Sequence, residues 1–254
     1  MTAKAKAHFL KHKNKYTGLF IVTLVILAIV IAYTRGYRFT DSFTLAKVGE
    51  LSITVPLSGT TIYIDIAEET KTTKNNETVN ITLSPQTHSV ILAHAGYYPW
   101  TKKFRIESEK KIELYPFFVS TNASGVIITN TDPEYGKIKY DIATKETPTK
   151  AKPKISKDGK VLLYLEDNAI VARTGSTTIS VIQPDTIIRN LDFYKNRSDA
   201  VIFSTSNAIY AMEIDKTGGQ NFMPIYKGVF PSFIQPAPNY LYVEDGTSLL
   251  QVGI

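Results

Sequence analysis

The side chains of this 254-residue chain that could carry out chemistry include four histidines. His88 and His94 fall at the two ends of one predicted strand, about 20 Å apart along extended backbone, so the pair cannot share a metal ion. His94 alternates with apolar neighbours, which favours a packing role over that of a general base. His8 and His12 precede a long apolar segment and lie apart from the rest of the chain. The histidines therefore predict no metal site.

Carboxylates occur as neighbours at Glu68-Glu69 and Glu166-Asp167, in predicted loops where adjacent side chains point apart. The chain has no cysteine, no nucleophile elbow, no glycine-rich phosphate loop and no HExxH motif. We therefore predict no enzyme, no catalytic residue and no cofactor. A glycan-acting enzyme is the alternative, since carboxylates from distant strands that converged within about 5–10 Å would suit glycoside hydrolysis.

An aromatic block, AGYYPWTKKFRI at residues 95–106, contains the only tryptophan. Tyr97, Tyr98 and Trp100 could form a stacking platform for carbohydrate, which would make this region a carbohydrate-binding module. Alternation along the strand places Trp100, Lys102 and Phe104 on one side, and this favours a buried tryptophan. We therefore predict mainly structural roles for Trp100 and Tyr97.

Short alternating segments fill the region around this block. Predicted strands cover residues 50–55, 61–66, 79–83, 88–94, 100–106 and 111–114, and residues 68–78 form a polar excursion. Turns are predicted at Pro56-Leu57-Ser58-Gly59 and before Pro99. Pro99 suits the first residue of a strand, because proline has no backbone N–H to donate to the sheet. These strands predict a small β domain over residues 48–116.

Residues 50–115 resemble the PEGA domain, a small β-sandwich module of bacterial surface proteins. The segments that carry the resemblance are Ile62-Tyr63-Ile64-Asp65, Leu83-Ser84-Pro85 and the block from Gly96 to Trp100. The resemblance implies a β-sandwich in the cell envelope. It also implies that the aromatic block is a corner that pins the last hairpin, with structural motif residues Ile62, Asp65, Gly96, Trp100 and Phe104.

A second repeat follows residue 116. Asn168-Ala169-Ile170, Asn207-Ala208-Ile209 and Thr247-Ser248-Leu249 recur with a spacing of about 40 residues, each after a β-branched or aromatic strand. The spacing predicts four-stranded units with Ile170, Ile209 and Leu249 at equivalent buried positions, in residues 117–254. The turn at 156–160 resembles the turn that opens blades in bacterial propeller-like repeats, so we predict about three propeller-like blades.

Three features of this second region bear on its shape. Acidic turns at Glu166-Asp167-Asn168 and Glu244-Asp245-Gly246 suit hairpins better than calcium sites, because no third ligand is suitably spaced. The lysine- and proline-rich segment 143–155 predicts an exposed loop. The apolar ending at Leu249–Ile254 predicts an open β edge, through which the chain could self-associate.

No helical stripe of ten residues is found after residue 50.

Composition limits the partners. The formal net charge is +6, but five lysines before residue 16 account for most of it, namely Lys4, Lys6, Lys11, Lys13 and Lys15. The remainder is nearly neutral and lacks the basic surface that nucleic-acid binding requires. We therefore predict no nucleic-acid partner, and an all-β exported part with one N-terminal helix.

The compartment follows from residues 17–34. Their apolar run, Leu19–Tyr33, has no charge and one polar residue, Thr23, and Tyr16 and Tyr33 are placed as interfacial rings. The length of the run and its basic N-terminal flank predict one transmembrane helix with residues 1–16 as a cytoplasmic basic tail and the bulk of the chain outside. A signal peptide cleaved after Ala32 is the alternative.

Together these patterns predict a single-pass membrane-anchored, extracytoplasmic binding or scaffold protein of the bacterial cell envelope. Candidate partners are cell-wall polysaccharide or another envelope protein. A sensor is disfavoured, because the short segment before the membrane cannot hold an output domain.

Overall fold

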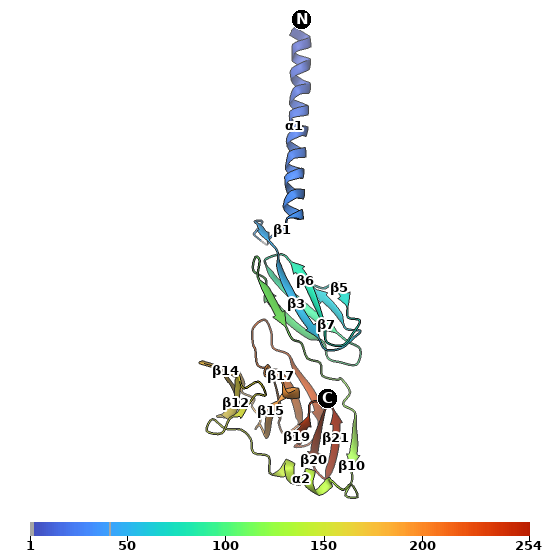
Figure 1. Cartoon of the computed structure of the whole chain (residues 1–254), viewed down its shortest axis with the longest axis vertical. Helices are drawn as coiled ribbons and strands as arrows, with labels where there is room; N and C mark the ends of the chain where they lie inside the picture. Colours follow the sequence, from blue (N-terminus) through green and yellow to red (C-terminus); the bar gives the residue numbers. More distant parts are fainter. Residues whose placement is uncertain (1–2, 41) are drawn as a thin grey trace. The chain divides into compact units, whose positions relative to one another are not determined.

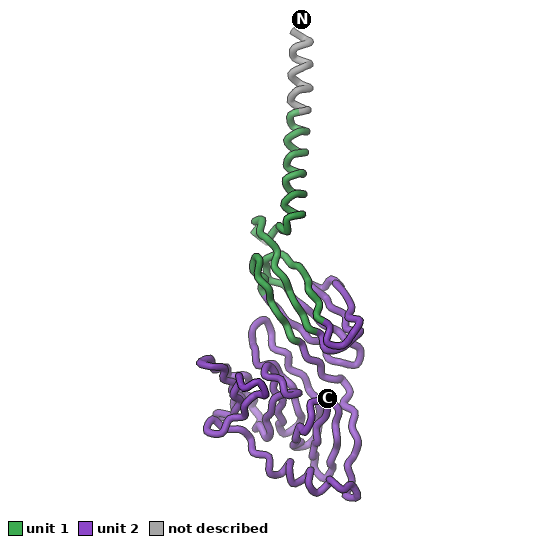
Figure 2. The backbone as a smooth tube through the Cα atoms, viewed as in Figure 1, with its two compact units in different colours: residues 1–54, 78–88, 105–115 green, residues 55–77, 89–104, 116–254 purple. Residues whose placement is uncertain are grey.

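The computed structural model describes residues 3–40 and 42–254, and the side chains from Thr17 onward. The side chains of the predicted basic tail therefore lie outside the described residues. The chain forms two compact units (Figure 2): residues 1–54, 78–88 and 105–115, and residues 55–77, 89–104 and 116–254. The predicted domain 48–116 contributes strands to both units.

The N-terminal helix α1 spans Ala3–Thr34, so it continues through the predicted tail (Figure 1). Its segment Thr17–Thr34 is 18 residues long, has a mean hydropathy of 2.5 and contains no buried residue. The helix ends where Gly36 adopts a φ of +82°, a left-handed conformation that glycine accepts without strain. Beyond it, the Arg38 guanidinium lies 4.1 Å from the centre of the Tyr33 ring.

The rest of the first unit is a hairpin and a three-stranded sheet. The hairpin pairs β1 (Tyr37–Phe39) with β2 (Leu45–Lys47). The sheet has the order β6-β3-β9, from β3 (Gly49–Val55), β6 (Glu77–Leu83) and β9 (Lys111–Leu114), with β3 and β9 parallel. Leu51, Ile53 and Val55 are fully buried, as their alternation predicts, and Ser52 is buried as well.

The second unit contains a four-stranded sheet in the order β5-β4-β7-β8. Its strands are β4 (Thr61–Ile64), β5 (Ala67–Lys71), β7 (Thr87–Ala93) and β8 (Trp100–Arg105). The predicted strand 61–66 is too long, because Asp65 and Ile66 have positive φ and form a hairpin turn with Ile66 exposed. The predicted polar excursion supplies β5, whose backbone pairs with β4 although its side chains, except the half-buried Thr70, are exposed.

Three further four-stranded antiparallel sheets complete this unit. The first has the order β11-β12-β13-β14 and the second β15-β16-β17-β18. Their strands are β11 (Lys154–Ile155), β12 (Val161–Glu166), β13 (Ala169–Thr174), β14 (Thr177–Ile182), β15 (Asn190–Phe193), β16 (Ala200–Ser204), β17 (Ala208–Glu213) and β18 (Phe222–Lys227). A short 3₁₀ turn, η1 (Tyr194–Asn196), follows β15. The third sheet has the order β10-β21-β20-β19, from β10 (Gly125–Ile128), β19 (Ser232–Ala237), β20 (Tyr240–Asp245) and β21 (Ser248–Gly253).

The predicted repeat is confirmed at the level of strands. Ile170, Ile209 and Leu249 lie on β13, β17 and β21, each the second strand of the hairpin at the centre of its sheet, and each is at most 1% exposed. The hairpin turns before Ile170 and Leu249 are also as predicted, with positive φ at Asp167, Asn168 and Gly246. The all-β class with one N-terminal apolar helix is likewise confirmed.

The prediction of an open edge at Leu249–Ile254 is wrong. β21 has a neighbour on each side, because β10 pairs with it from Gly125 opposite Val252 to Ile128 opposite Leu249 (Figure 1). A strand from the start of the repeat region thus completes the last sheet, and the edge strands of that sheet are β10 and β19. β10 thus supplies the fourth strand of a sheet whose other strands, β19, β20 and β21, are consecutive in the chain.

A helix that the sequence did not predict, α2 (Tyr135–Ala143), packs against the third sheet. Its buried residues Ile138 and Ile142 lie one turn apart and contact Leu249. Tyr135, Ile128, Ile234 and Tyr242 surround this contact. Only two of the nine residues are fully buried, so the stripe was too short to stand out in the sequence.

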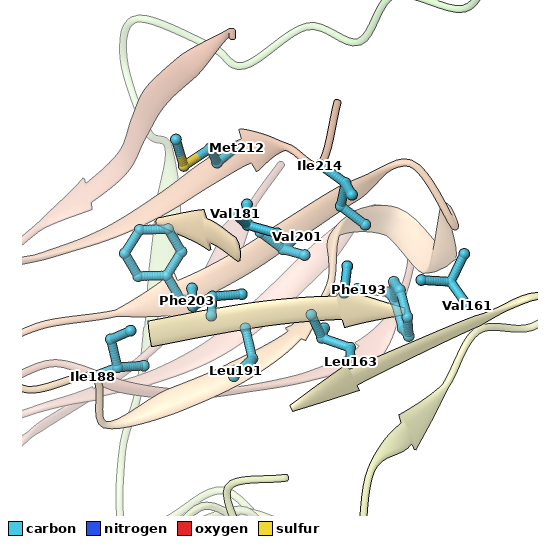
Figure 3. Close-up of a cluster of buried hydrophobic side chains, with 12 residues drawn as sticks. Val161, Leu163, Val181, Ile188, Leu191, Phe193, Val201, Phe203, Met212 and Ile214 are labelled. Carbon is cyan, nitrogen blue, oxygen red and sulfur yellow. The ribbon is translucent and has the colours of Figure 1, made fainter. Parts of the chain in front are cut away.

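A continuous core joins the first two sheets of the repeat (Figure 3). Leu163 and Ile170 from the first sheet pack with Leu191, Val201 and Phe203 from the second, all at most 1% exposed. The first two sheets therefore cover each other's apolar faces, as expected of units that cannot bury their own faces alone.

Candidate functional site

The structure separates the three aromatic residues of the predicted platform. Trp100 is 2% exposed, so the burial predicted from alternation is confirmed and its ring is not available for stacking on a ligand. Tyr97 is half-buried, with its ring centre 5.1 Å from that of His94 and 5.9 Å from that of Phe118. Tyr98 lines a separate pocket of about 320 Å³.

The corner formed by Gly96 holds a segment that follows it in the chain. The Gly96 carbonyl accepts hydrogen bonds from the backbone and hydroxyl of Thr121, at 2.9 and 3.1 Å, and the Tyr98 N–H donates to the Val119 carbonyl. Gly96 has a φ of +81°, which suits glycine. The corner thus attaches the segment that leads into the repeat region.

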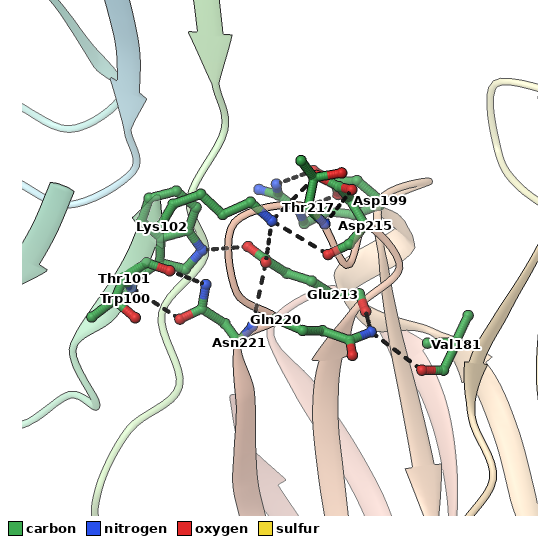
Figure 4. A network of polar contacts seen from close by, with 11 residues as sticks. Trp100, Thr101, Lys102, Val181, Asp199, Glu213, Asp215, Thr217, Gln220 and Asn221 are labelled. Atoms are coloured by element: carbon green, nitrogen blue, oxygen red, sulfur yellow. Dashed lines mark hydrogen bonds and ion pairs between the residues drawn. The ribbon is translucent and has the colours of Figure 1, made fainter. Parts of the chain in front are cut away.

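Close to this corner lies a buried polar network (Figure 4) centred on Glu213, at the end of β17. The Trp100 indole N–H donates to Glu213 Oε1 at 2.6 Å, and the Lys102 ammonium donates to Glu213 Oε2 at 3.0 Å. Lys102 also contacts Asp215 Oδ2 at 3.2 Å. Burial alone would raise the pKa of Asp215, but hydrogen bonds from Thr217 and the charge of Lys102 outweigh it and lower that pKa.

Amide side chains extend the network to the backbone of β8. The Asn221 side chain accepts from the Thr101 N–H at 2.9 Å and donates to the Thr101 carbonyl at 2.8 Å, much as a neighbouring strand would. Gln220 donates to the Glu213 carbonyl at 2.6 Å. Since its charges and amides are bonded to one another, the network serves to join β8 to the second sheet of the repeat.

The loop that carries Gly218 approaches β8 closely. The Lys103 N–H donates to the Gly218 carbonyl at 2.7 Å, and a Cβ on Gly218 would lie 1.6 Å from the Lys103 carbonyl oxygen. Gly218 also has a φ of +71°. Because both sterics and backbone conformation oppose a side chain, we expect Gly218→Ala to cost about 2–4 kcal/mol of unfolding free energy.

Urea denaturation of the variant and the natural protein would measure this cost. Gly219→Ala is the matched control, since Gly219 also has positive φ but a Cβ there would have no described heavy atom within 4 Å beyond its chain neighbours. Equal losses for the two variants would show that φ, rather than the close approach to β8, sets the cost.

Other residues singled out in the sequence have structural surroundings. His88 is buried with its Nε2 2.9 Å from the Ser84 carbonyl, and His94 lies between the carbonyls of Ala95 and Ser58. Asp65 accepts from the Ser89 N–H at 2.8 Å, and Ile62 and Phe104 are buried in their sheet. Glu68 and Glu69 are exposed on β5 rather than in a loop. Within the described residues, no three His, Cys, Asp or Glu side chains could hold a metal ion together.

The acidic hairpin turns hold connecting loops. Asp245 accepts from the Val229 N–H at 2.8 Å and from the Tyr226 hydroxyl at 2.9 Å. Burial together with this carboxylate raises the pKa of Tyr226 to about 12. Asn168 bonds to the carbonyls of Pro184 and Thr186 and to the Ile188 N–H. The predicted turn roles of these residues are therefore supported by their contacts.

A pocket of about 580 Å³ with charged walls lies in the repeat region. Its wall comes almost entirely from the lysine- and proline-rich segment predicted to be an exposed loop, and Leu191 on β15 completes it. The lining residues are Lys145, Glu146, Thr147, Pro148, Thr149, Lys152, Pro153, Lys154 and Leu191. We call this site the lysine pocket.

The segment that forms the lysine pocket is fixed to the sheets around it. The Leu165 N–H donates to the Pro148 carbonyl at 2.9 Å, and the Thr147 hydroxyl donates to the Arg189 carbonyl at 2.8 Å. Thr149 and Lys152 exchange two backbone hydrogen bonds that close a tight turn. The pocket wall is thus an ordered part of the fold rather than a free loop.

Asp192 lies beside this pocket and binds two of its lysines. Lys145 Nζ is 2.9 Å from Asp192 Oδ2, and Lys154 Nζ is 2.7 Å from Asp192 Oδ1. The Asp192 side chain is 7% exposed, that of Lys145 15% and that of Lys154 45%. The Lys145 ammonium also lies 4.6 Å from the centre of the Phe233 ring, which offers a cation–π contact.

Electrostatics set the protonation of this cluster. Burial by itself would raise the pKa of Asp192, but the ammonium groups of Lys145 and Lys154 outweigh it and hold that pKa below its ordinary value. Burial lowers the pKa of Lys145, and the attraction of Asp192 only partly opposes this shift. The two ammonium groups therefore favour the ionised form of the carboxylate, while burial disfavours the charged form of Lys145.

The topology explains why these groups meet. Lys154, Asp192 and Phe233 lie on β11, β15 and β19, each an edge strand of one of the three repeat sheets. The second and third of these strands are joined, since Asn190 Oδ1 accepts from the Phe233 N–H at 3.0 Å and Gln235 donates to the Phe193 carbonyl at 3.2 Å. The lysine pocket thus lies where these edge strands of the three sheets approach one another.

Sequence reasoning missed Lys145, Lys154 and Asp192. One signal was present, because Asp192 stands between Leu191 and Phe193 in a short apolar strand and a buried carboxylate needs a cationic partner. Comparison with protein-family models and with curated proteins found no match for this chain.

Proposed function

We propose that the chain is a single-pass membrane protein of the bacterial cell envelope whose β sheets bind or scaffold a partner outside the cytoplasm. The observation that carries the proposal is the apolar segment Thr17–Thr34 of α1, which spans about 27 Å at 1.5 Å per residue and contains no buried residue. A soluble protein would leave this surface in water at high cost.

Orientation is proposed from charge. Five lysines precede the apolar segment, whereas only Arg35 and Arg38 closely follow it, and this bias favours a cytoplasmic N-terminus. The resemblance of residues 50–115 to PEGA modules and the propeller-like repeat support a place in the envelope. The contact of Arg38 with the Tyr33 ring suits the interface between membrane and water, where such groups are enriched.

Binding, rather than catalysis, fits the acidic groups that the fold buries. Glu213 is bonded to Lys102 and Trp100, and Asp192 is bonded to two lysines, so both carboxylates serve as counter-ions within the protein. Cell-wall polysaccharide and another envelope protein are the partners that we propose.

Single-cysteine labelling tests the proposed topology, because the natural chain contains no cysteine and gives no background. Ala5→Cys places a thiol before the apolar segment, and Ile187→Cys places one on a residue that is 76% exposed. With a membrane-impermeant maleimide on intact bacterial cells, we expect labelling of the second variant only, and labelling of the first after lysis.

The same cells distinguish an anchor from a cleaved signal. We expect the full-length chain to stay in the membrane fraction after alkaline carbonate extraction. A mature protein that begins at Tyr33 and washes off would contradict the anchor, and labelling of Ala5→Cys in intact cells would contradict the orientation.

A further inference from the structure

We infer that the lysine pocket binds a small organic anion, through a carboxylate or phosphate group held by Lys154 and Lys145. The inference rests on the proposed function in one respect: the ligand would come from outside the cytoplasm. The ability of the pocket to bind an anion is argued from the contacts of its own residues. A pocket of about 580 Å³ lies within the range of small-molecule sites.

The charges of the cluster are unbalanced. Lys145 and Lys154 bring two positive charges to the single carboxylate of Asp192, and Lys152 is paired separately with Glu146. The pocket therefore carries about one excess positive charge beside the buried Asp192 and the largely buried Lys145. An anion that enters it would supply the missing counter-charge without displacing Asp192.

Donors remain for such a ligand. An ammonium group has three N–H donors, and within the described residues Lys145 donates one hydrogen bond, to Asp192 at 2.9 Å. The Lys154 side chain is 45% exposed, so its ammonium is accessible from the pocket while it contacts Asp192. Two lysine ammonium groups that contact the same carboxylate can therefore also converge on one oxyanion.

Desolvation strengthens the argument. Burial lowers the pKa of Lys145 despite the neighbouring carboxylate, so its surroundings disfavour the charged ammonium. A bound anion would relieve this cost, because it adds an opposite charge where the effective dielectric constant is low.

The remaining wall suits the organic part of the ligand. Pro153 offers half-buried apolar surface next to the buried Pro148 and Leu191, and Thr149 contributes an exposed side chain with a hydroxyl group. A sugar acid or a sugar phosphate combines an oxyanion with a sugar ring, whose apolar faces and hydroxyl groups suit this mixed wall. Such a group could be a free molecule or one residue of an anionic wall polymer, and both sources share the same oxyanion chemistry.

The test uses the full chain in nanodiscs of zwitterionic lipid, titrated by calorimetry with glucuronate, glucose 6-phosphate, neutral glucose and poly(glycerol phosphate). We expect at least one of the anions to bind and glucose not to bind. Binding of the monomers indicates a free ligand, and binding of the polymer alone indicates a wall polymer. Failure of all three anions to bind would overturn the inference.

The decisive variant is Lys154→Gln, which should weaken anion binding by about tenfold, as expected for loss of one charge-assisted contact. Lys150→Gln is the matched control. Lys150 lies in the same segment but pairs with Glu166, is 66% exposed and does not line the pocket, so its loss should change affinity by less than about a factor of two. Equal weakening by both variants would indicate general surface charge and overturn the site.

Asp192→Asn gives an independent readout. It removes the internal counter-ion and leaves two lysines facing the pocket, so the binding anion should raise the melting temperature of this variant more than that of the natural protein. No greater shift in the folded variant would contradict the inference. These measurements use purified protein, so they test the anion site independently of the membrane topology. A negative binding result would leave the proposed topology intact, and a negative labelling result would leave the anion site intact.

Discussion

Trp100→Ala is expected to lower the free energy of unfolding by about 3–5 kcal/mol, as measured by urea denaturation of the full chain in detergent. Two losses combine in this variant. The largest fully buried side chain of the described residues is removed and leaves a cavity, and Glu213 Oε1 loses its 2.6 Å hydrogen bond from the indole. A buried carboxylate oxygen without its donor is costly, since water cannot easily replace the bond.

Trp100→Phe separates the two losses. Phenylalanine keeps most of the volume and removes only the N–H donor, so we expect a smaller cost, about 1–3 kcal/mol. Tyr98→Ala is the control on the same corner, because Tyr98 is partly exposed and lines a different pocket. An unchanged melting temperature for Trp100→Ala, with loss of a carbohydrate ligand, would show that the tryptophan serves recognition instead.

Ile209→Asp should have the largest effect of any single change considered. Ile209 is fully buried on β17, between β16 and β18, so a carboxylate there would be removed from water in the interior of the sheet. We expect a cost of more than about 4–5 kcal/mol, comparable with the whole stability of a typical domain. Hydrogen exchange of the full chain should then show loss of protection across β15 to β18.

The control for this variant is Ile187→Asp, which places the same charge on a residue that is 76% exposed. Its exchange pattern should match that of the natural protein. If β15 to β18 of Ile209→Asp kept their protection from hydrogen exchange, the stability of the second repeat sheet would not depend on Ile209. That result would contradict the prediction that Ile209 occupies a buried position equivalent to those of Ile170 and Leu249.

Local patterns in the sequence were sufficient for the repeat and for the burial of Trp100. The spacing of Ile170, Ile209 and Leu249 reflects a unit of fixed length, and alternation along β8 places Trp100, Lys102 and Phe104 on one face. The first signal is a pattern that recurs along the chain, and the second arises within one strand, where neighbouring residues determine which side chain is buried.

The pairing of β10 with β21 could not be predicted in this way. β10 is four residues long, and nothing in Gly125–Ile128 identifies its partner, since strands separated widely in sequence pair through tertiary structure. The prediction of an edge at Leu249–Ile254 was wrong for the same reason. α2 was missed because only Ile138 and Ile142 give its buried face.

The lysine pocket was missed because its charges become informative only when the sheets converge. Lysines and prolines in residues 143–155 have the composition of an exposed linker, and most of the segment is indeed exposed. Lys145 becomes buried through its contacts with Asp192 and Phe233, which come from two other sheets. Composition describes the segment correctly but cannot reveal which of its lysines the fold removes from water.

The joining of β10 to β21 also has a consequence for the order in which the chain can fold. During synthesis β10 leaves the ribosome well before β21, so the last sheet cannot gain its fourth strand until the first two repeat sheets and the β19–β20 hairpin have emerged. Until then the exposed apolar residues Val126 and Ile127 sit on an unpaired strand, a state prone to wrong pairing. The slow step in acquiring the native repeat region should therefore be this long-range closure rather than formation of any single hairpin.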